Sequence, residues 1–101
     1  MKMKIEIQLF EGCPNSEEMK NRVLNAIKQS GFYADYFETY VETPEMADKI
    51  GFRGSPTVLV NGIDLENLPE PKEASLACRY YVNGLPSIEE IKEFIIQKAK
   101  T

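Results

Sequence analysis

The chain begins with a segment in which apolar and polar side chains alternate. Apolar residues stand at positions 5, 7 and 9, and polar residues stand at positions 4, 6 and 8. This period of two is typical of a half-buried strand. Further along, apolar residues recur at helical spacing (Met19, Val23, Ala26, Ile27). The pattern predicts a strand and then a helix, with Pro14 at the first helical position and Gly31 at the stop.

The next segment combines a second strand with a short helix. Residues 32–41 are rich in aromatic and β-branched side chains, which favour strands. Thr43 and Pro44 open a short helix, and Gly51 closes it. Because a helix connects the first strand to the second, that crossover should be right-handed and the two strands parallel.

A hairpin follows the short helix. Residues 57–60 read Thr-Val-Leu-Val, which predicts a third strand. Asn61-Gly62 is a strong two-residue hairpin turn, so residues 63–65 should form a fourth strand, antiparallel to the third.

The last part of the chain holds a broad connection and a helix. Residues 66–86 contain three prolines and Cys78. Ser87 and Glu90 have the spacing of a capping box, and the helix that follows has one apolar face (Ile88, Ile91, Phe94, Ile95, Ala99). The whole pattern predicts a single α/β domain over residues 1–101, in the order strand, helix, strand, helix, strand, strand, helix.

Composition and charge narrow the classes of function. The 101 residues fit one domain with one core. The net charge of −4 argues against nucleic-acid binding and gives no attraction to anionic membranes. Polar residues interrupt the first apolar segment, unlike a signal peptide, and no apolar run is long enough to span a bilayer. We expect a cytoplasmic protein, in a compartment that keeps thiols reduced, with neither nucleic acid nor membrane as partner.

The residues available for chemistry are few. The chain has two cysteines, Cys13 and Cys78, and no histidine. A four-ligand zinc site would need carboxylates or a second chain, and Ser-His-Asp or Cys-His catalysis is excluded. A backbone group, a helix terminus or a cation must therefore activate any nucleophile, and no cofactor is expected.

Cys13 lies in the segment FEGCPNSEEM, at the predicted start of the first helix. A helix N-terminus favours an anion, and cysteines in such settings have pKa values lowered to roughly 3.5–7.5. Arg53 could add a nearby cation or could be a solvated loop charge. Cys13 could also be a small buried hydrophobe, but its Gly-Cys-Pro setting favours a reactive thiol. Ser16 can donate a hydrogen bond to the thiolate or serve as a helix-start hydroxyl, and it cannot resolve a mixed disulfide.

Three patches of the sequence, FEGCPN, GFRGSPTVLVNG and SLACRYY, together resemble the thioredoxin-fold superfamily. The chain most resembles small prokaryotic thioredoxin-like proteins with a Gly-Cys-Pro-Asn-Cys site, some of which are labelled as similar to alkylmercury lyase. Here Ser16 replaces the second cysteine of that site. The resemblance covers almost the whole chain. It implies a thioredoxin-like fold with a four-stranded mixed sheet of order 2-1-3-4, strand 3 antiparallel and helices on both faces.

The resemblance also gives meaning to Ser55-Pro56-Thr57. It implies that Pro56 follows a cis peptide bond and faces Cys13. A cis peptide bond is energetically inexpensive only before proline. The backbone of Ser55 would then be free to pair with an extended thiol substrate, as an added strand would. An ordinary strand-edge proline is the alternative interpretation.

Cys78 is the candidate for the missing sulfur. Strand three should begin, and strand four should end, at the same end of the sheet as Cys13, so the connection that holds Cys78 should emerge beside it. Cys78 could also simply pack among its apolar neighbours. Arg79 could bind a carboxylate, stabilise a thiolate or form a surface ion pair. The predicted catalytic residues are Cys13, Ser16, Pro56 and Cys78, and the predicted substrate-binding residues are Pro14, Arg53, Ser55 and Arg79.

Three functions fit these residues. The first is a thiol–disulfide oxidoreductase that acts on protein or small-molecule disulfides and thiols, glutathione among them. In it Cys13 attacks a disulfide, and Cys78 or an external thiol resolves the product. The second is binding of a soft ion, Hg(II) or Cu(I), by the sulfurs of Cys13 and Cys78. The third is a thioredoxin-fold protein that binds partners without turnover. The fold alone does not choose among them, and we favour the first.

Overall fold

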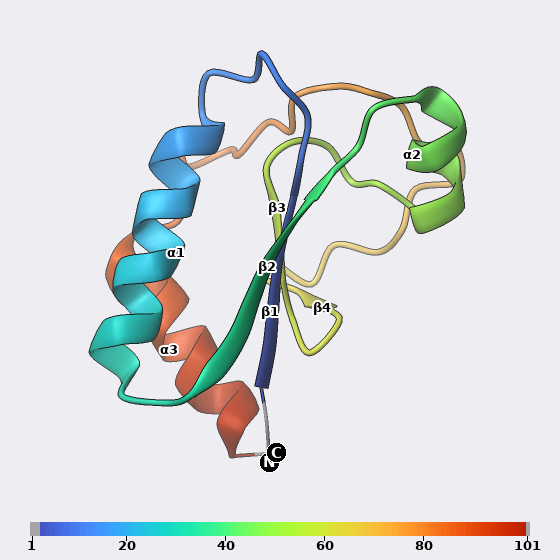
Figure 1. The fold of residues 1–101 in the computed structure, drawn as a ribbon. Helices are drawn as coiled ribbons and strands as arrows, with labels where there is room; N and C mark the ends of the chain where they lie inside the picture. Colours follow the sequence, from blue (N-terminus) through green and yellow to red (C-terminus); the bar gives the residue numbers. More distant parts are fainter. Residues whose placement is uncertain (1–2, 101) are drawn as a thin grey trace.

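The computed structural model describes residues 3–100 and contains four strands and three helices (Figure 1). In chain order they are β1 (Met3–Leu9), α1 (Ser16–Ser30), β2 (Ala34–Tyr40), α2 (Pro44–Ile50), β3 (Thr57–Val60), β4 (Ile63–Asp64) and α3 (Ile88–Ala99). The predicted order of elements is confirmed. The domain predicted over residues 1–101 also includes residues 1, 2 and 101, which lie outside the described part. No described helix has the length and apolar character needed to cross a bilayer.

The four strands form one mixed sheet with the order β2-β1-β3-β4. Strand β1 runs parallel to β2 and antiparallel to β3, and β3 is antiparallel to β4. In the register, Ile7 of β1 lies between Glu38 of β2 and Val58 of β3. The predicted α/β fold class and sheet order are therefore confirmed.

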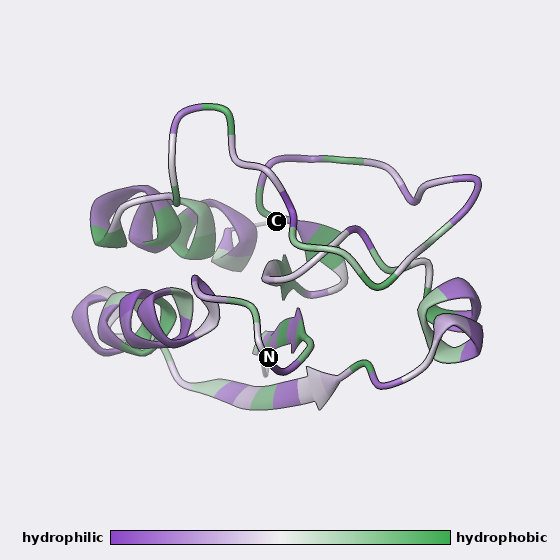
Figure 2. Cartoon of the chain, turned by 90° about the horizontal axis from the view of Figure 1, so that it is seen from above, coloured by the Kyte–Doolittle hydropathy of each residue, from purple (hydrophilic) through white to green (hydrophobic). Residues whose placement is uncertain are grey.

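Helices cover both faces of the sheet. Helices α1 and α3 pack together on one face, and α2 lies on the other side (Figure 1). The larger core lies under α1 and α3 and includes Ile5, Ile7 and Met19. A smaller cluster beneath α2 contains Val41 and Phe52. Seen from above, the edge strand β2 carries hydrophilic and hydrophobic bands (Figure 2), and its residues are partly or fully exposed.

The start of α1 and the end of β4 differ from their predicted positions. Helix α1 begins at Ser16, and Pro14 lies in the turn before it, so the prediction that Pro14 is the first helical residue is wrong. In that turn the Ser16 N–H donates to the Cys13 carbonyl. Strand β4 ends at Asp64 because its carboxylate accepts hydrogen bonds from the N–H groups of Glu66 and Leu68, which turns the chain away from the sheet.

The predicted start and end of α2 and the predicted start of α3 are confirmed. The Thr43 hydroxyl accepts from the Met46 N–H at the start of α2, and Gly51 ends that helix in a left-handed conformation. Ser87 and Glu90 form the predicted capping box at the start of α3, with both reciprocal hydrogen bonds present. The capping box sets where α3 begins. It therefore also sets where the long connection that carries Cys78 ends.

Candidate active site

Cys13 lies in the loop between β1 and α1, directly after Gly12. Its side chain is only 7% exposed. As a thiol it donates to the Ser55 carbonyl oxygen at 3.3 Å, and it accepts from the Cys78 thiol at 3.0 Å. The two sulfurs are not bonded, because a disulfide bond is about 2.05 Å long. The site is a dithiol whose sulfurs already touch.

A short backbone pairing places Cys78. The Ser55 N–H donates to the Ala77 carbonyl at 2.9 Å, and the Arg79 N–H donates to the Ser55 carbonyl at 2.8 Å. These two bonds form a parallel bridge between Ser55 and Cys78. Ser55, two positions before β3, therefore holds the segment around Cys78 as an added strand. This pairing directs Cys78 toward Cys13.

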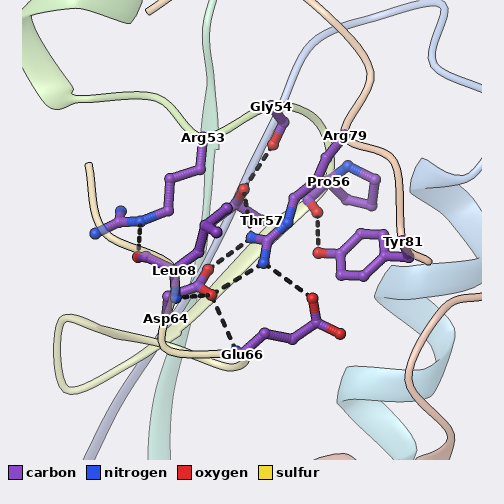
Figure 3. A network of polar contacts seen from close by, with 9 residues as sticks. All are labelled: Arg53, Gly54, Pro56, Thr57, Asp64, Glu66, Leu68, Arg79 and Tyr81. Carbon is purple, nitrogen blue, oxygen red and sulfur yellow. Dashed lines mark hydrogen bonds and ion pairs between the residues drawn. The ribbon is translucent and has the colours of Figure 1, made fainter. Parts of the chain in front are cut away.

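Side chains anchor the same segment to the sheet. The Arg79 guanidinium forms a bidentate pair with Asp64, with N–O distances of 2.6 and 3.0 Å, and both side chains are buried (Figure 3). It also contacts Thr57 Oγ1 at 3.2 Å. The Tyr81 hydroxyl donates to the Pro56 carbonyl at 2.5 Å, and the guanidinium lies 4.7 Å from the centre of the Tyr81 ring. Paired and hydrogen-bonded in this way, the buried charges position residues 77–81 firmly.

Gly54 is needed for this close approach. A Cβ atom at this position would lie 2.9 Å from Arg79 Cβ and 3.0 Å from Arg79 Cα. Its φ of 104° is also in the region that favours glycine. The peptide bond between Ser55 and Pro56, which follows directly, is cis.

The two thiols differ in acidity. Burial is the largest influence on Cys13 and raises its pKa. Hydrogen bonds from the Cys78 thiol, the Ser55 side chain, the Asn15 N–H and the Ser16 side chain together outweigh burial, so the pKa of Cys13 is lowered. The Cys78 pKa is raised, first because its thiol donates to Cys13, then by burial and by the negative charge of Cys13. The arrangement therefore favours a Cys13 thiolate that accepts a hydrogen bond from a protonated Cys78.

Hydroxyl groups surround the Cys13 sulfur. Ser16 is buried at the first position of α1, and its Oγ lies 3.4 Å from Ser55 Oγ. Ser55 Oγ in turn accepts from the Phe10 N–H at 3.2 Å. Ser16 also lowers the pKa of Cys13 through a hydrogen bond, so it contributes a donor where the resembling proteins have a second sulfur.

The two predicted arginines are engaged elsewhere. The sequence predicts Arg79 in substrate binding or in a surface ion pair, but its ion pair with Asp64 is buried and joins the long connection to β4. The Arg53 Nε donates to the Leu68 carbonyl at 2.7 Å, so this side chain also braces the connection (Figure 3). Neither guanidinium has a described contact with a sulfur. Sequence reasoning missed Asp64 and Tyr81, because nothing near them in the sequence signals a partner 15 or 25 positions away.

A hollow opens on one side of Cys13. It has a volume of about 410 Å³, and its lining includes Phe10, Gly12, Cys13, Lys20 and Tyr40. The Lys20 ammonium lies within hydrogen-bond distance of Tyr40 and Glu17. Among residues 3–100, no group of three or more histidine, cysteine, aspartate or glutamate side chains is arranged to hold a metal ion. The sulfurs of Cys13 and Cys78 are the groups that could bind a metal ion, as a pair of thiolates.

Comparison with known families agrees with this geometry. The family model described as a thioredoxin domain matches residues 3–64, which run from β1 to β4 and include Cys13, Ser55 and Pro56. Cys78 and its anchors beyond β4 lie outside the match. No curated protein matches the sequence. Because the match covers more than half of the chain and the sheet has the expected order, the chain belongs to the thioredoxin domain family.

Proposed function

We propose that the protein is a thiol–disulfide oxidoreductase in which Cys13 is the attacking thiol and Cys78 the resolving thiol. The observation that carries the proposal is the 3.0 Å contact between the two sulfurs, with the Cys78 thiol as donor. Membership of the thioredoxin domain family supports a redox or binding function in general terms. We propose a cytoplasmic location, where the dithiol would be kept reduced.

The proposed reaction has two exchange steps. The Cys13 thiolate attacks one sulfur of a disulfide RSSR, the S–S bond breaks, and the released RS⁻ takes a proton from water. Cys78 then gives its proton to solvent and attacks Cys13 Sγ, which forms the Cys13–Cys78 disulfide and releases the second RS⁻. The substrate gains two electrons and the protein loses two. Two equivalents of an external thiol, such as glutathione, return the protein to the dithiol and leave as their own disulfide.

The division of roles follows from the acidities. The attacking species in thiol exchange is the thiolate, and the lowered pKa of Cys13 increases its thiolate fraction. The raised pKa of Cys78 keeps that sulfur protonated until Cys13 has reacted. Once Cys13 forms a mixed disulfide, its negative charge is gone and Cys78 is no longer held as a hydrogen-bond donor. Cys78 can then lose its proton and resolve the intermediate.

Distance also favours disulfide exchange. Closing the sulfurs from 3.0 Å to a bond of about 2.05 Å needs a movement of roughly 1 Å. A movement of that size is within reach of side-chain rotation in a segment held by two backbone hydrogen bonds. The parallel bridge between Ser55 and Cys78 can therefore persist in both redox states.

Turnover of a small disulfide with glutathione as the reductant tests the proposal. Cys13→Ser should abolish protein-dependent turnover. Cys78→Ser should form a mixed disulfide at Cys13 and then turn over only as fast as glutathione resolves it. The proposal is wrong if the folded Cys13→Ser variant keeps the wild-type rate.

A second candidate is two-coordinate binding of a soft cation. It is favoured by one observation, the pairing of two sulfurs without a third ligand group among the described residues. Hg(II) and Cu(I) prefer sulfur ligands. A linear site with metal–sulfur bonds of about 2.3 Å would need sulfurs about 4.6 Å apart, taking the zinc–thiolate bond as the measure. The sulfurs would then have to separate, whereas a disulfide needs them to approach, so the reduced geometry favours exchange.

A further inference from the structure

The backbone of Ser55 is already occupied by the protein itself. Its N–H and its carbonyl are both bonded to residues 77–79, at 2.9 and 2.8 Å. Residues 77–81 are here called the strap. A free N–H and carbonyl beside a reactive thiol would form an edge to which an extended peptide could add as a strand. The strap fills that edge, and it presents a cysteine to Cys13 as a bound peptide disulfide would.

The strap is held by more than its backbone bonds. Arg79 is paired with the buried carboxylate of Asp64, and the Tyr81 hydroxyl is bonded to the Pro56 carbonyl. Displacing the strap would separate a buried ion pair and leave both charges without partners. Because the strap is part of the same chain, it competes with any peptide at a high effective concentration.

A second approach to Cys13 remains open. The hollow of about 410 Å³ beside Cys13 is lined by Phe10, Gly12 and Lys20 among others, and its lining includes no residue of the strap. Its volume falls within the range of small-molecule sites. A small disulfide could reach the Cys13 sulfur through this hollow while the strap stays in place.

We propose that the strap makes the site selective for small-molecule disulfides and excludes disulfides of extended polypeptides. Backbone pairing at Ser55 is the recognition element that a polypeptide would need, and the strap holds it. Arg79, Asp64 and Tyr81 are then positioning residues for this selectivity. The inference rests on the proposed oxidoreductase function and names the substrate class of the same site.

The test measures the attack step alone. In the Cys78→Ser variant, Cys13 forms a mixed disulfide that no internal thiol resolves, and mass spectrometry counts it. Bis(2-hydroxyethyl) disulfide serves as the small substrate, and a disulfide between two eight-residue peptides serves as the extended one. Each rate is divided by the rate of the same disulfide with free glutathione, which removes differences in intrinsic reactivity.

Asp64→Asn and Tyr81→Phe, each in the Cys78→Ser background, loosen the strap in different ways. Glu66→Gln is the matched control, because Glu66 contacts the same guanidinium from a half-exposed position and the buried pair remains. Hydrogen exchange of the Ser55 and Arg79 amides reports strap occupancy directly in every variant. Tyr81→Phe keeps the buried charges and the aromatic ring, so it can test the role of the strap even if Asp64→Asn does not fold.

We expect the normalised rate for the small disulfide to exceed that for the peptide disulfide by about 100-fold, a typical advantage of an intramolecular competitor. Tyr81→Phe should narrow the gap by about tenfold, the effect of one lost buried hydrogen bond. The rate with the small disulfide should stay unchanged, and Glu66→Gln should keep the full gap.

Equal normalised rates for the two disulfides in the Cys78→Ser variant itself would overturn the inference. So would a gap that persists after the Ser55 and Arg79 amides lose protection. Failure of Cys13 to react with either disulfide would instead refute the oxidoreductase function on which the inference rests.

Discussion

Cys13 and Cys78 are separated by 65 positions in the sequence, and their sulfur atoms lie 3.0 Å apart. The contact depends on Ser55, which bonds to the chain on both sides of Cys78 and accepts a hydrogen bond from the Cys13 thiol. Ser55, two positions before β3, thus holds both halves of the pair. The motif at the start of α1 keeps a hydroxyl, Ser16, where the resembling proteins have a sulfur. The second sulfur comes from the long connection instead.

The first prediction concerns the acidity of the two thiols. The alkylation rate of Cys13, measured against pH in Cys78→Ser, should have its midpoint below the ordinary thiol value of 9.0, because its thiolate is favoured by hydrogen bonds. In the wild-type protein the initial alkylation rate of Cys78, counted by mass spectrometry on molecules whose Cys13 is still unmodified, should have its midpoint above 9.0. Cys78→Ala should raise the Cys13 midpoint relative to Cys78→Ser, since alanine offers no donor. Faster alkylation of Cys78 than of Cys13 below neutral pH would contradict the assignment.

The second prediction concerns Ser16. In the Cys78→Ser background, Ser16→Cys should restore turnover of a small disulfide, because it places a resolving thiol in the first turn of α1 next to Cys13. Ser16→Ala in the same background is the control, and it should restore nothing. If Ser16→Cys folds and gives no gain, the lack of a resolving thiol is not what limits turnover.

The third prediction concerns the buried ion pair. Asp64→Asn should lower the free energy of unfolding by about 3–5 kcal/mol, because Arg79 would keep a buried charge without its partner. Glu89→Gln removes an exposed partner of Lys92 and should cost at most about 1 kcal/mol. Urea denaturation of both variants measures the difference. Equal, small effects would mean that the pair with Arg79 does not anchor the strap.

The fourth prediction concerns Gly54. Gly54→Ala should slow formation of the Cys13–Cys78 disulfide and destabilise the protein by more than about 1 kcal/mol, because the added Cβ meets the backbone of Arg79. Gly84→Ala is the matched control, since Gly84 also has a positive φ but has open space around its Cβ position. Oxidation kinetics should therefore change for Gly54→Ala and stay the same for Gly84→Ala. The close approach of the strap would be unimportant if both variants oxidise at the wild-type rate.

Local signals made most of the fold predictable. The alternation in β1, the capping box of Ser87 and Glu90, and the Asn61-Gly62 turn each act within a few residues, so the sequence displays them directly. The start of α1 was misplaced because Pro14 suits both a turn and a first helical position, and the Ser16 bond to the Cys13 carbonyl selects the turn.

The site was less predictable, because its contacts join distant parts of the chain. Strand order indicated that Cys78 would return to the same end as Cys13, but not that Ser55 would hold its neighbours. The buried partner of Arg79 could not be foreseen either. An arginine at the surface and one paired with Asp64 look the same in the sequence, and only the tertiary fold distinguishes them.

The central claim is that Cys13 and Cys78 form one redox pair, and mild oxidation followed by peptide mapping tests it most directly. We predict one intramolecular disulfide between Cys13 and Cys78 at low protein concentration, reversed by millimolar glutathione. Closing a loop of about 65 residues should raise the free energy of unfolding by roughly 4 kcal/mol in the chain-entropy model, so the oxidised protein should melt at a higher temperature. Recovery of only Cys13-linked dimers or glutathione adducts, with Cys78 still a free thiol, would contradict the account.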